Sequence, residues 1–535
     1  MKTDKQIEEI LESLTLDEMI GQMFCYNLIA DVDELEKNIR KTHAGSLFTA
    51  GRTKEEIKYG TDLLNKYSKI PGMIAADIEC GPGHVVPGEI RLPHEMAWGA
   101  CGDADLIERA HEAVAIRCRE LGVHWTFSPI VDINFNMDNP STNIRAVSDN
   151  PETVAKMCVA AVKGYQKNGL IGAGCKHFPG DGVDDRNQHF CTPVNNMSKE
   201  EWMNTFGYVY KEMFKANTAS VMVAHFSLPA YDEKLNDWLG YPPATLSYNL
   251  QTKLLKEELG FDGCIVSDAL SMVGACACVD HDRLSIEFVK AGGDILLFPL
   301  PEYFDEIKGA VESGEIPIER IKDAARRVLK LKNKVRLFED QDEVLRGIDL
   351  EQNLVNLEKC ADEIAEKSLN LVRNYGDILP IKVKPGDKIL IIELKKSREK
   401  EKAFYACDLD VVEEELKKRG YNVVRCVNPR REEFVDDLDD AAAVLINCKI
   451  SCQDYLGGSL RITWEHVMPF WRGAVLKHKQ IVFTSFGDPY KLHDFPYLKT
   501  YVNAFSYSEA TQRAFVKALL GEIPFQGESP VVIND

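Results

Sequence analysis

Residues 171–182 read IGAGCKHFPGDG, and this stretch indicates how the first part of the chain folds. Small and apolar residues run up to Lys176 and His177, and the chain then turns at Pro179-Gly180. A short apolar run that ends in a turn is typical of a strand buried on both faces. Ionisable groups at the end of such a strand lose solvation and add nothing to a core. We therefore expect them to bind something polar.

Eight segments of the N-terminal part have the same apolar, strand-like character. They are Gly21–Leu28, Ala44–Ala50, Gly72–Glu79, Val123–Pro129, Ile171–Lys176, Ser220–His225, Gly263–Asp268 and Asp294–Phe298. Amphipathic stretches lie between several of them, such as Asp105–Leu121, Pro151–Asn168 and Ser198–Ala216. Eight apolar strands separated by helices within about 300 residues predict a closed, parallel (β/α)8 barrel of the TIM type. An open, doubly wound sheet is the alternative.

Ionisable residues fall where several of these strands end. At the ends of the third, fifth, sixth and seventh strands stand, in turn, Asp77 with Glu79, Lys176 with His177, His225, and Asp268. The C-terminal ends of barrel strands share one face, and that face carries the active site in barrel enzymes. We therefore expect these side chains to converge.

The 535 residues suffice for two or three domains. A basic helical stretch, 321–339, looks like the last barrel helix, and the acidic residues 340–357 follow it. A second α/β unit is expected beyond them, with strands Lys388–Leu394, Asn422–Cys426, Ala443–Asn447 and Gln480–Phe486 and helices Val411–Arg419, Trp464–Leu476 and Ser508–Leu520. We predict a barrel domain over residues 1–340, a linker over 341–384 and a three-layer, flavodoxin-like α/β domain over 385–535.

Composition excludes some partners and locations. The formal net charge of −20 argues against nucleic acid as a binding partner. The chain starts with a charged amphipathic helix, and no apolar run approaches about 18 residues, so we expect neither a secretory signal nor a membrane span. The fifteen cysteines lack framework spacing and indicate reduced thiols in a cytoplasm. Cys276 and Cys278 with His281 rarely suffice for a tetrahedral site, so we expect no metal.

Two residues could carry the chemistry of bond cleavage. Asp268 lies where an apolar strand meets a loop. It could cap a helix, or attack a carbon centre as a nucleophile. His189 could be a solvated loop residue, but Asn187 stands two residues before it and could fix its tautomer. Histidine titrates near neutral pH and can act first as an acid and then as a base. A carboxylate nucleophile with such a proton shuttle is the minimum for retaining glycoside hydrolysis.

Four further residues could bind a sugar. Lys176 and His177 could donate hydrogen bonds to sugar hydroxyls, and Arg145 and Asp77 could complete such a set. The alternatives are a surface ion pair for Arg145, a cap for Asp77, and one exposed and one packed side chain at the strand end.

Together these residues resemble the family 3 glycoside hydrolases, and within them the β-N-acetylglucosaminidase branch. That branch has a Lys-His-Phe-Pro-Gly-x-Gly stretch that ends in Asp-x-His, a Ser-Asp nucleophile segment and an Asp-x-Glu-Gly-Gly segment. The likeness spans nearly the whole chain, since SFGDPY at 485–490 and LGEIPF at 520–525 resemble the C-terminal domain of the family. The resemblance implies an exo-acting, retaining enzyme that removes N-acetylglucosamine from the non-reducing ends of glycans or cell-wall fragments, without a cofactor.

The resemblance also implies roles for individual residues. Asp268 corresponds to the nucleophile, His189 to the acid/base and Asn187 to the residue that pairs with it. The positions that correspond to sugar-binding residues are Asp77, Arg145, Lys176 and His177. Family 3 β-glucosidases take their acid/base from a glutamate outside this loop, which favours the hexosaminidase branch.

Three residues depart from the pattern of that branch: Asn187 replaces the dyad aspartate, Cys80 a glycine and Val85 an arginine. Asparagine can accept a hydrogen bond from imidazole but cannot stabilise its positive charge. Asp184 or Asp185 could substitute for the missing carboxylate. We expect an active enzyme. The alternatives are a β-glucosidase of the same fold, a glycoside phosphorylase of that fold, and a sugar-binding protein that is catalytically weak or silent. Phosphorolysis is considered because a neutral histidine repels an anionic acceptor less than a carboxylate base would.

Overall fold

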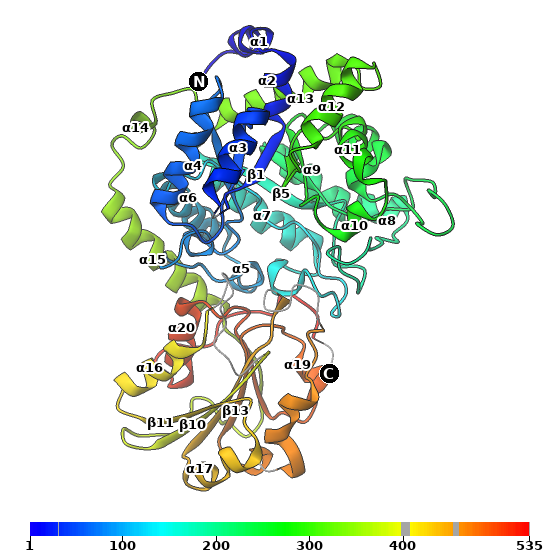
Figure 1. Cartoon of the computed structure of the whole chain (residues 1–535). Coiled ribbons are helices and arrows are strands. Elements are labelled where there is room, and N and C mark those ends of the chain that lie inside the picture. The colour runs from blue at the N-terminus through cyan, green and yellow to red at the C-terminus, as the bar shows by residue number, and fades with distance from the viewer. Residues whose placement is uncertain (30, 397–406, 453–458, 474, 534–535) are drawn as a thin grey trace.

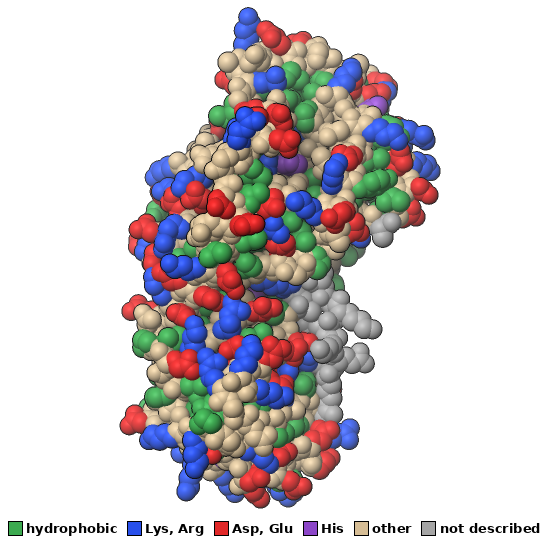
Figure 2. Space-filling view, turned by 90° about the vertical axis from the view of Figure 1, so that its left-hand side faces the viewer, with side chains coloured by type: hydrophobic (Ala, Val, Ile, Leu, Met, Phe, Trp, Pro, Cys, Tyr) green, Lys and Arg blue, Asp and Glu red, His purple; other side chains and the backbone are tan. Residues whose placement is uncertain are grey.

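The computed structural model describes residues 1–29, 31–396, 407–452, 459–473 and 475–533. Two units follow each other along the chain, and Figure 1 shows one above the other. An eight-stranded sheet forms the centre of the first unit and a six-stranded sheet that of the second. On the face in Figure 2, acidic and basic side chains are interspersed over both units.

The first sheet is the predicted barrel. Its strands are β1 (Phe24–Asn27), β2 (Ser46–Phe48), β3 (Met73–Ala76), β4 (Trp125–Thr126), β5 (Gly172–Phe178), β6 (Ser220–Val223), β7 (Cys264–Ser267) and β8 (Leu296–Leu297). Neighbouring strands are parallel in the order β7-β6-β5-β4-β3-β2-β1-β8, and a bridge between Val266 and Ile295 links the two end strands. Apart from Asn27, every residue of these strands is buried, as the apolar runs predict.

Helices surround this barrel. They are α1 (Asp4–Glu12), α2 (Leu16–Gln22), α3 (Val32–Thr42), α4 (Lys54–Tyr67), α5 (Glu95–Cys101), α6 (Ala104–Glu120), α7 (Pro151–Gln166), α8 (Lys199–Asn204), α9 (Phe206–Lys215), the π-helix η5 (Asn249–Glu258), α10 (Val273–Cys276), α11 (Leu284–Ala291), α12 (Tyr303–Glu312) and α13 (Ile318–Lys334). The single helix predicted over 198–216 is two helices, α8 and α9. Thr205 leaves helical geometry between them, and its hydroxyl bonds the carbonyl of Glu201 at 2.7 Å. Such side-chain bonds compete with the helix ladder.

The segment predicted as a linker, 341–384, contains regular structure. It holds α14 (Gln341–Val344), α15 (Leu350–Ser368) and β9 (Asn370–Asn374). Asp349 caps α15, and Leu357, Cys360, Ala361 and Ile364 form its buried face. Their spacing of three and four residues fits one side of a helix within an otherwise acidic stretch. Because α15 packs against α5 and α6 of the first unit and α20 (Glu509–Leu519) of the second, it joins the two.

The second sheet has the strand order β11-β10-β12-β13-β14-β9. Its further strands are β10 (Lys388–Lys395), β11 (Asn422–Val427), β12 (Ala443–Lys449), β13 (Ile481–Ser485) and β14 (Thr500–Asn503). All neighbours are parallel except β9, which is antiparallel to β14. Four of these strands match predicted segments, whereas β9 and β14 have no predicted counterpart.

Helices cover both faces of the second sheet, which confirms the predicted three layers. Ile389 and Ile391 pack with α16 (Asp410–Lys418) and α20, whereas Leu390 and Ile392 pack on the opposite side with Phe470. That opposite layer also holds α17 (Val435–Asp440), α19 (Lys491–Asp494) and the 3-10 helices η8 (Trp464–Gly473) and η9 (Val475–Lys477). The helix predicted over 464–476 is therefore a pair of 3-10 helices, with Pro469 inside the first. Proline removes a helical donor and disfavours a continuous α-helix.

Candidate active site

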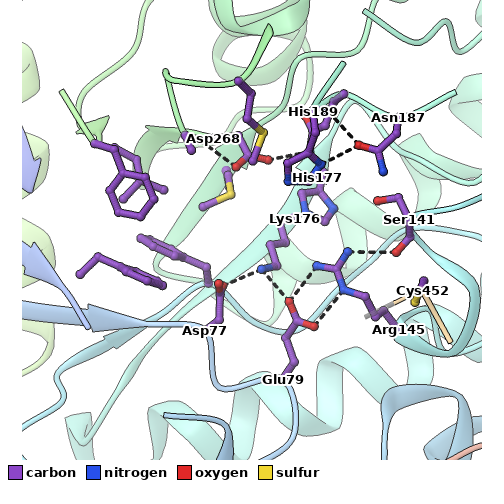
Figure 3. Close-up of a pocket in the computed structure, with 18 of the residues that line it drawn as sticks. Asp77, Glu79, Ser141, Arg145, Lys176, His177, Asn187, His189, Asp268 and Cys452 are labelled. Carbon is purple, nitrogen blue, oxygen red and sulfur yellow. Dashed lines mark hydrogen bonds and ion pairs between the residues drawn. The ribbon is translucent and has the colours of Figure 1, made fainter. Parts of the chain in front are cut away.

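The C-terminal ends of the barrel strands surround a cavity of about 230 Å³ (Figure 3). All seven residues that the sequence analysis selected line it: Asp77, Arg145, Lys176, His177, Asn187, His189 and Asp268. Glu79, Ser141 and His84 from the barrel unit and Cys452 from the second unit also contribute. The predicted convergence at one end of the barrel is confirmed, with one exception. His225 is not among the lining residues, because Thr245 Oγ1 and the Ala269 carbonyl engage its two ring nitrogens behind the cavity.

One wall of the cavity is a cluster of four charged side chains (Figure 3). Lys176 Nζ lies 2.6 Å from Asp77 Oδ1 and 2.8 Å from Glu79 Oε1. The guanidinium of Arg145 binds both oxygens of Glu79, at 3.0 and 2.8 Å, and donates to the carbonyl of Ser141. Arg145 is therefore not part of a surface ion pair, and Lys176 is not an exposed strand-end residue. The two-pronged contact fixes the guanidinium plane at the cavity wall.

The charges of this cluster are unequally stabilised. Burial opposes ionisation of Glu79, but Arg145 and Lys176 together hold the pKa of its carboxyl well below the usual range. Burial raises the pKa of Asp77, and the negative charge of Glu79 adds to that rise although Lys176 opposes it. With 23% of its side chain exposed, Asp77 is also the most accessible of the four. Asp77 is thus the carboxyl group of the cluster that an incoming ligand can reach.

On another wall, the carboxylate of Asp268 is held by two hydrogen-bond donors. The backbone N–H of Ala269 donates to Oδ1 at 2.8 Å, and Gln188 Nε2 donates to Oδ2 at 2.7 Å. The next helix, α10, starts only at Val273 with Met272 as its N-cap, so Asp268 is not a helix cap. Burial opposes ionisation of Asp268, but His177, His225 and the Ala269 N–H outweigh it and lower the pKa of the carboxyl. Asp268 is therefore anionic at neutral pH, as a nucleophile must be.

Gln188 was not selected by the sequence analysis, although it lies between Asn187 and His189. It is buried, and besides donating to Asp268 its Oε1 accepts the backbone N–H of His225 at 2.9 Å. A glutamine amide can donate and accept at once, which lets Gln188 tie the loop of His189 to the ends of β6 and β7. In the sequence, its position between the candidate residues Asn187 and His189 is the signal that could have identified Gln188 as part of the site.

Asn187 fixes the tautomer of His189. The Oδ1 atom of Asn187 accepts the backbone N–H of His189 at 2.8 Å and contacts Nδ1 of the same ring at 2.6 Å. A backbone N–H can only donate, so the Asn187 atom is an oxygen and Nδ1 must carry a proton. Nε2 is thereby left to exchange a proton with a ligand. This is the tautomer that an acid/base catalyst at this position requires.

The environment of His189 favours neutral imidazole. Burial lowers the pKa of His189, and the negative charge of Asp268 only partly offsets that effect. Asp184 does not replace the missing dyad carboxylate, because its Oδ2 accepts the Val194 N–H at 2.7 Å and pairs with Arg186. Asp185 is exposed. Asn187 is thus the partner of the imidazole.

The loop that follows β5 is shaped by two glycines and one buried aspartate. Gly180 and Gly182 have φ values of 116° and 101°, and a Cβ on Gly182 would lie 2.0 Å from the carbonyl oxygen of Ile133. Only glycine fits such a conformation and contact without strain. Asp132, another residue that the sequence analysis did not select, accepts His177 Nδ1 at 2.6 Å and the Asp181 N–H at 2.8 Å. Asp132 therefore orients the ring of His177.

The other departures from the sequence pattern lie away from the ligand space. Cys80 and Val85 are buried and do not line the cavity. His84 does line it, and burial lowers the pKa of its imidazole to about 3, so His84 is neutral.

Among the described residues, no group of three or more His, Cys, Asp or Glu side chains could hold a metal ion. None of the described helices is long and apolar enough to cross a membrane.

Comparison with known proteins places this site in a family. Residues 15–331 match the glycosyl hydrolase family 3 N-terminal domain. A Cellulomonas fimi protein named β-N-acetylglucosaminidase/β-glucosidase is 30% identical over 98% of this chain and 95% of its own length. A β-hexosaminidase A from Pseudoalteromonas piscicida is 32% identical, over 50% of this chain and 48% of its own.

Two solved structures resemble the whole chain. One is a β-glucoside phosphorylase bound to 2FGlc, with a TM-score of 0.88, 29% identity and coverage of 99% of this chain and 96% of that one. The other is a family 3 β-N-acetylglucosaminidase from Paenibacillus sp. str. FPU-7, with a TM-score of 0.83, 25% identity and coverage of 97% and 99%. The family model spans more than half of the chain, and the barrel carries its charged cavity where a barrel enzyme has its active site, so this chain belongs to glycosyl hydrolase family 3.

Proposed function

We propose that this glycosidase is a retaining, exo-acting β-N-acetylglucosaminidase. The observation that carries the proposal is the placement of an ionised Asp268 in the same cavity as a His189 whose tautomer is fixed by Asn187. The relatives named β-N-acetylglucosaminidase or β-hexosaminidase support the substrate. A cavity of about 230 Å³ supports binding of one terminal sugar.

The reaction would proceed in two displacements. Asp268 attacks the anomeric carbon, the glycosidic bond breaks, and imidazolium His189 gives its Nε2 proton to the leaving oxygen. The resulting glycosyl ester on Asp268 is attacked by water, whose proton returns to Nε2. The sugar keeps its β configuration because the anomeric carbon is inverted twice. Gln188 and the Ala269 N–H stabilise the carboxylate as it leaves in the second step.

The charged cluster would bind the sugar. Asp77 presents an accessible carboxylate to hydroxyl groups, and Lys176 and Arg145 present donors beside it. The ring of His177, oriented by Asp132, adds a further polar group. Several polar groups that converge in a small cavity are the usual basis of specificity for a small ligand.

Nitrophenyl β-glycosides of N-acetylglucosamine and of glucose test the proposal. The chain should release nitrophenol from the first with the higher kcat/KM, and Asp268→Asn should lower kcat on the order of 10⁴-fold or more. An Asp268→Asn variant with normal turnover would remove the mechanism. Preference for the glucoside would indicate a β-glucosidase, and sugar binding without release of product would indicate a binding protein.

Phosphorolysis is the second candidate. The similarity to a β-glucoside phosphorylase over almost the whole chain favours it, and so does the acid/base. A neutral imidazole repels an anionic acceptor less than a carboxylate would, so phosphate could attack the glycosyl ester in place of water. Product analysis in phosphate buffer distinguishes the two reactions. Sugar 1-phosphate is expected for a phosphorylase, and its absence would exclude this candidate.

A further inference from the structure

The segment SFGDPY, 485–490, has no part in the reaction proposed above, yet it meets the wall of the cavity. It follows β13 of the second unit, and two of its side chains bond a barrel loop, residues 134–145. Asp488 Oδ1 accepts Asn143 Nδ2 at 2.9 Å, and the hydroxyl of Tyr490 accepts Asn134 Nδ2 at 2.7 Å. All four residues are at most 5% exposed. Buried polar contacts of this kind define one relative position of the groups that they join.

Inside the barrel loop, the same two asparagines fix the backbone that leads to Arg145. Asn134 Oδ1 accepts the hydroxyl of Thr142 at 2.8 Å and the N–H of Asn143 at 3.1 Å. Asn143 has a φ of 42°, a left-handed conformation that few side chains other than asparagine tolerate. Arg145 follows two residues later. The contact between Asp488 and Asn143 is therefore made two residues before Arg145, whose guanidinium binds Glu79.

The anchor in the second unit is itself rigid. The N–H of Asp488 donates to the carbonyl of Ile450 at 2.8 Å, and Lys491 Nζ lies 2.5 Å from Asp488 Oδ2. A Cβ on Gly487 would lie 2.1 Å from the same Ile450 oxygen, so only glycine allows this approach. From the neighbouring strand end, Cys452 Sγ donates to the Thr142 carbonyl at 3.4 Å. Both strand ends therefore contact the same loop.

We propose that Asp488 and Tyr490 are positioning residues, through which the second unit holds Arg145 in the geometry that binds the sugar. This inference deepens the proposed function and rests on it. Neither side chain lines the cavity, so their influence on the substrate passes through the 134–145 loop. Loosening the loop should weaken binding of the sugar in the ground state and the transition state alike. That change raises KM and leaves kcat nearly unchanged.

Tyr490→Phe removes the contact with Asn134. Asn143→Gly removes the contact with Asp488 and also a bond inside the loop, from the N–H of Ile144 to Asn143 Oδ1. Phenylalanine keeps the buried ring, and glycine adopts the positive φ without strain. Ser506→Ala is the matched control, because Ser506 makes another buried bond between the units, to His94 Nδ1 at 2.9 Å, outside the loop. KM for the nitrophenyl glycoside should rise about tenfold for the first two variants and change less than about twofold for the control. Thermal unfolding of each variant verifies that it is folded at the assay temperature.

A double-mutant cycle with Arg145→Ala identifies the route of the effect. If Tyr490 acts through Arg145, Tyr490→Phe should change KM less than about twofold once Arg145 is alanine. If the KM increases of Tyr490→Phe and Arg145→Ala multiply fully in the double variant, the proposal is overturned. A wild-type KM for both Tyr490→Phe and Asn143→Gly would also overturn it, and so would an equal rise of KM for Ser506→Ala. These results differ from failure of the proposed function, in which the wild-type chain neither cleaves the glycosides nor binds N-acetylglucosamine or glucose in calorimetry.

Discussion

At the scale of single residues, the pair Asn187 and His189 carries the proton transfer of the proposed mechanism. An amide fixes the imidazole tautomer as well as a carboxylate would, since the oxygen of either group accepts a hydrogen bond from Nδ1–H. Because the amide adds no negative charge beside the imidazole, burial lowers the pKa of His189. The sequence alone predicts the pairing from the spacing of two residues. It does not predict that Asp184 is bound elsewhere, because that depends on the fold of the loop.

This pairing predicts the pH dependence of cleavage. In the proposed mechanism imidazolium His189 is the acid, and its pKa lies below the ordinary 6.5, so kcat/KM should fall as pH rises through a value below 6.5. A carboxylate at position 187 would stabilise imidazolium and raise its pKa, so Asn187→Asp should move this alkaline limb upward by about 1 pH unit or more, with equal or higher activity at neutral pH. The pH profiles of both proteins measure the shift. An unmoved limb, or a large loss of activity, would contradict the assigned role.

Gln188 supplies a second prediction at this scale. Gln188→Met keeps the size of the side chain and removes the donor to Asp268 together with the acceptor of the His225 N–H. A bond to a charged group contributes about 1.5–3 kcal/mol, so kcat should fall about 10- to 100-fold. The acid limb of kcat/KM should also move to higher pH, because the pKa of Asp268 rises when it loses a donor. Phe190→Leu, an exposed position on the same loop, is the control and should leave both quantities unchanged.

At the scale of elements, the barrel strands are predictable because they are short apolar runs, several of which end in polar residues. The elements that escape prediction are those whose sequence signal is weak. Only half-buried residues make up β9, so no apolar run marks it. The apolar face of α15 is diluted by acidic residues. Thr205 interrupts an amphipathic pattern that continues on both sides, so the pattern alone predicts one helix where α8 and α9 are two.

The loop after β5 offers a test of how an element serves the site. Gly182→Ala combines a positive φ with a contact of 2.0 Å to the Ile133 oxygen, whereas Gly314→Ala has a φ of 80° and no atom within 4 Å of the added Cβ. The second variant should lose only about 1–2 kcal/mol of unfolding free energy, the cost of left-handed backbone. The first should lose more and should also lower kcat/KM. Equal losses in denaturant titrations, with unchanged kinetics, would show that the loop does not depend on this glycine.

At the scale of the whole molecule, the second unit contacts the barrel loop 134–145, which forms part of the cavity wall. The sequence predicts four of the six strands of this unit and its three layers, but not its contact with the active site. That contact depends on Asp488, Tyr490 and Cys452, which lie more than 300 residues after the barrel loop that they touch. Spacing along a chain does not show which residues meet across an interface.

The interface predicts cooperative unfolding. The α15 helix packs on both units, and buried hydrogen bonds cross between them. Calorimetry should therefore record one transition for the two units together, and N-acetylglucosamine should raise its midpoint by binding only the native state. Two resolved transitions, with only the first shifted by the sugar, would show that the barrel unfolds independently.

The central claim is that Asp268 forms a glycosyl ester, and covalent trapping tests it most directly. A 5-fluoro N-acetylglucosaminyl fluoride slows both steps but leaves a good leaving group, so the intermediate should accumulate. Mass spectrometry of the intact chain should show the addition of one sugar, and the peptide that contains Asp268 should carry it. Asp268→Asn should remain unmodified. An adduct on another residue, or turnover of ordinary substrate with no adduct at Asp268, would contradict the account.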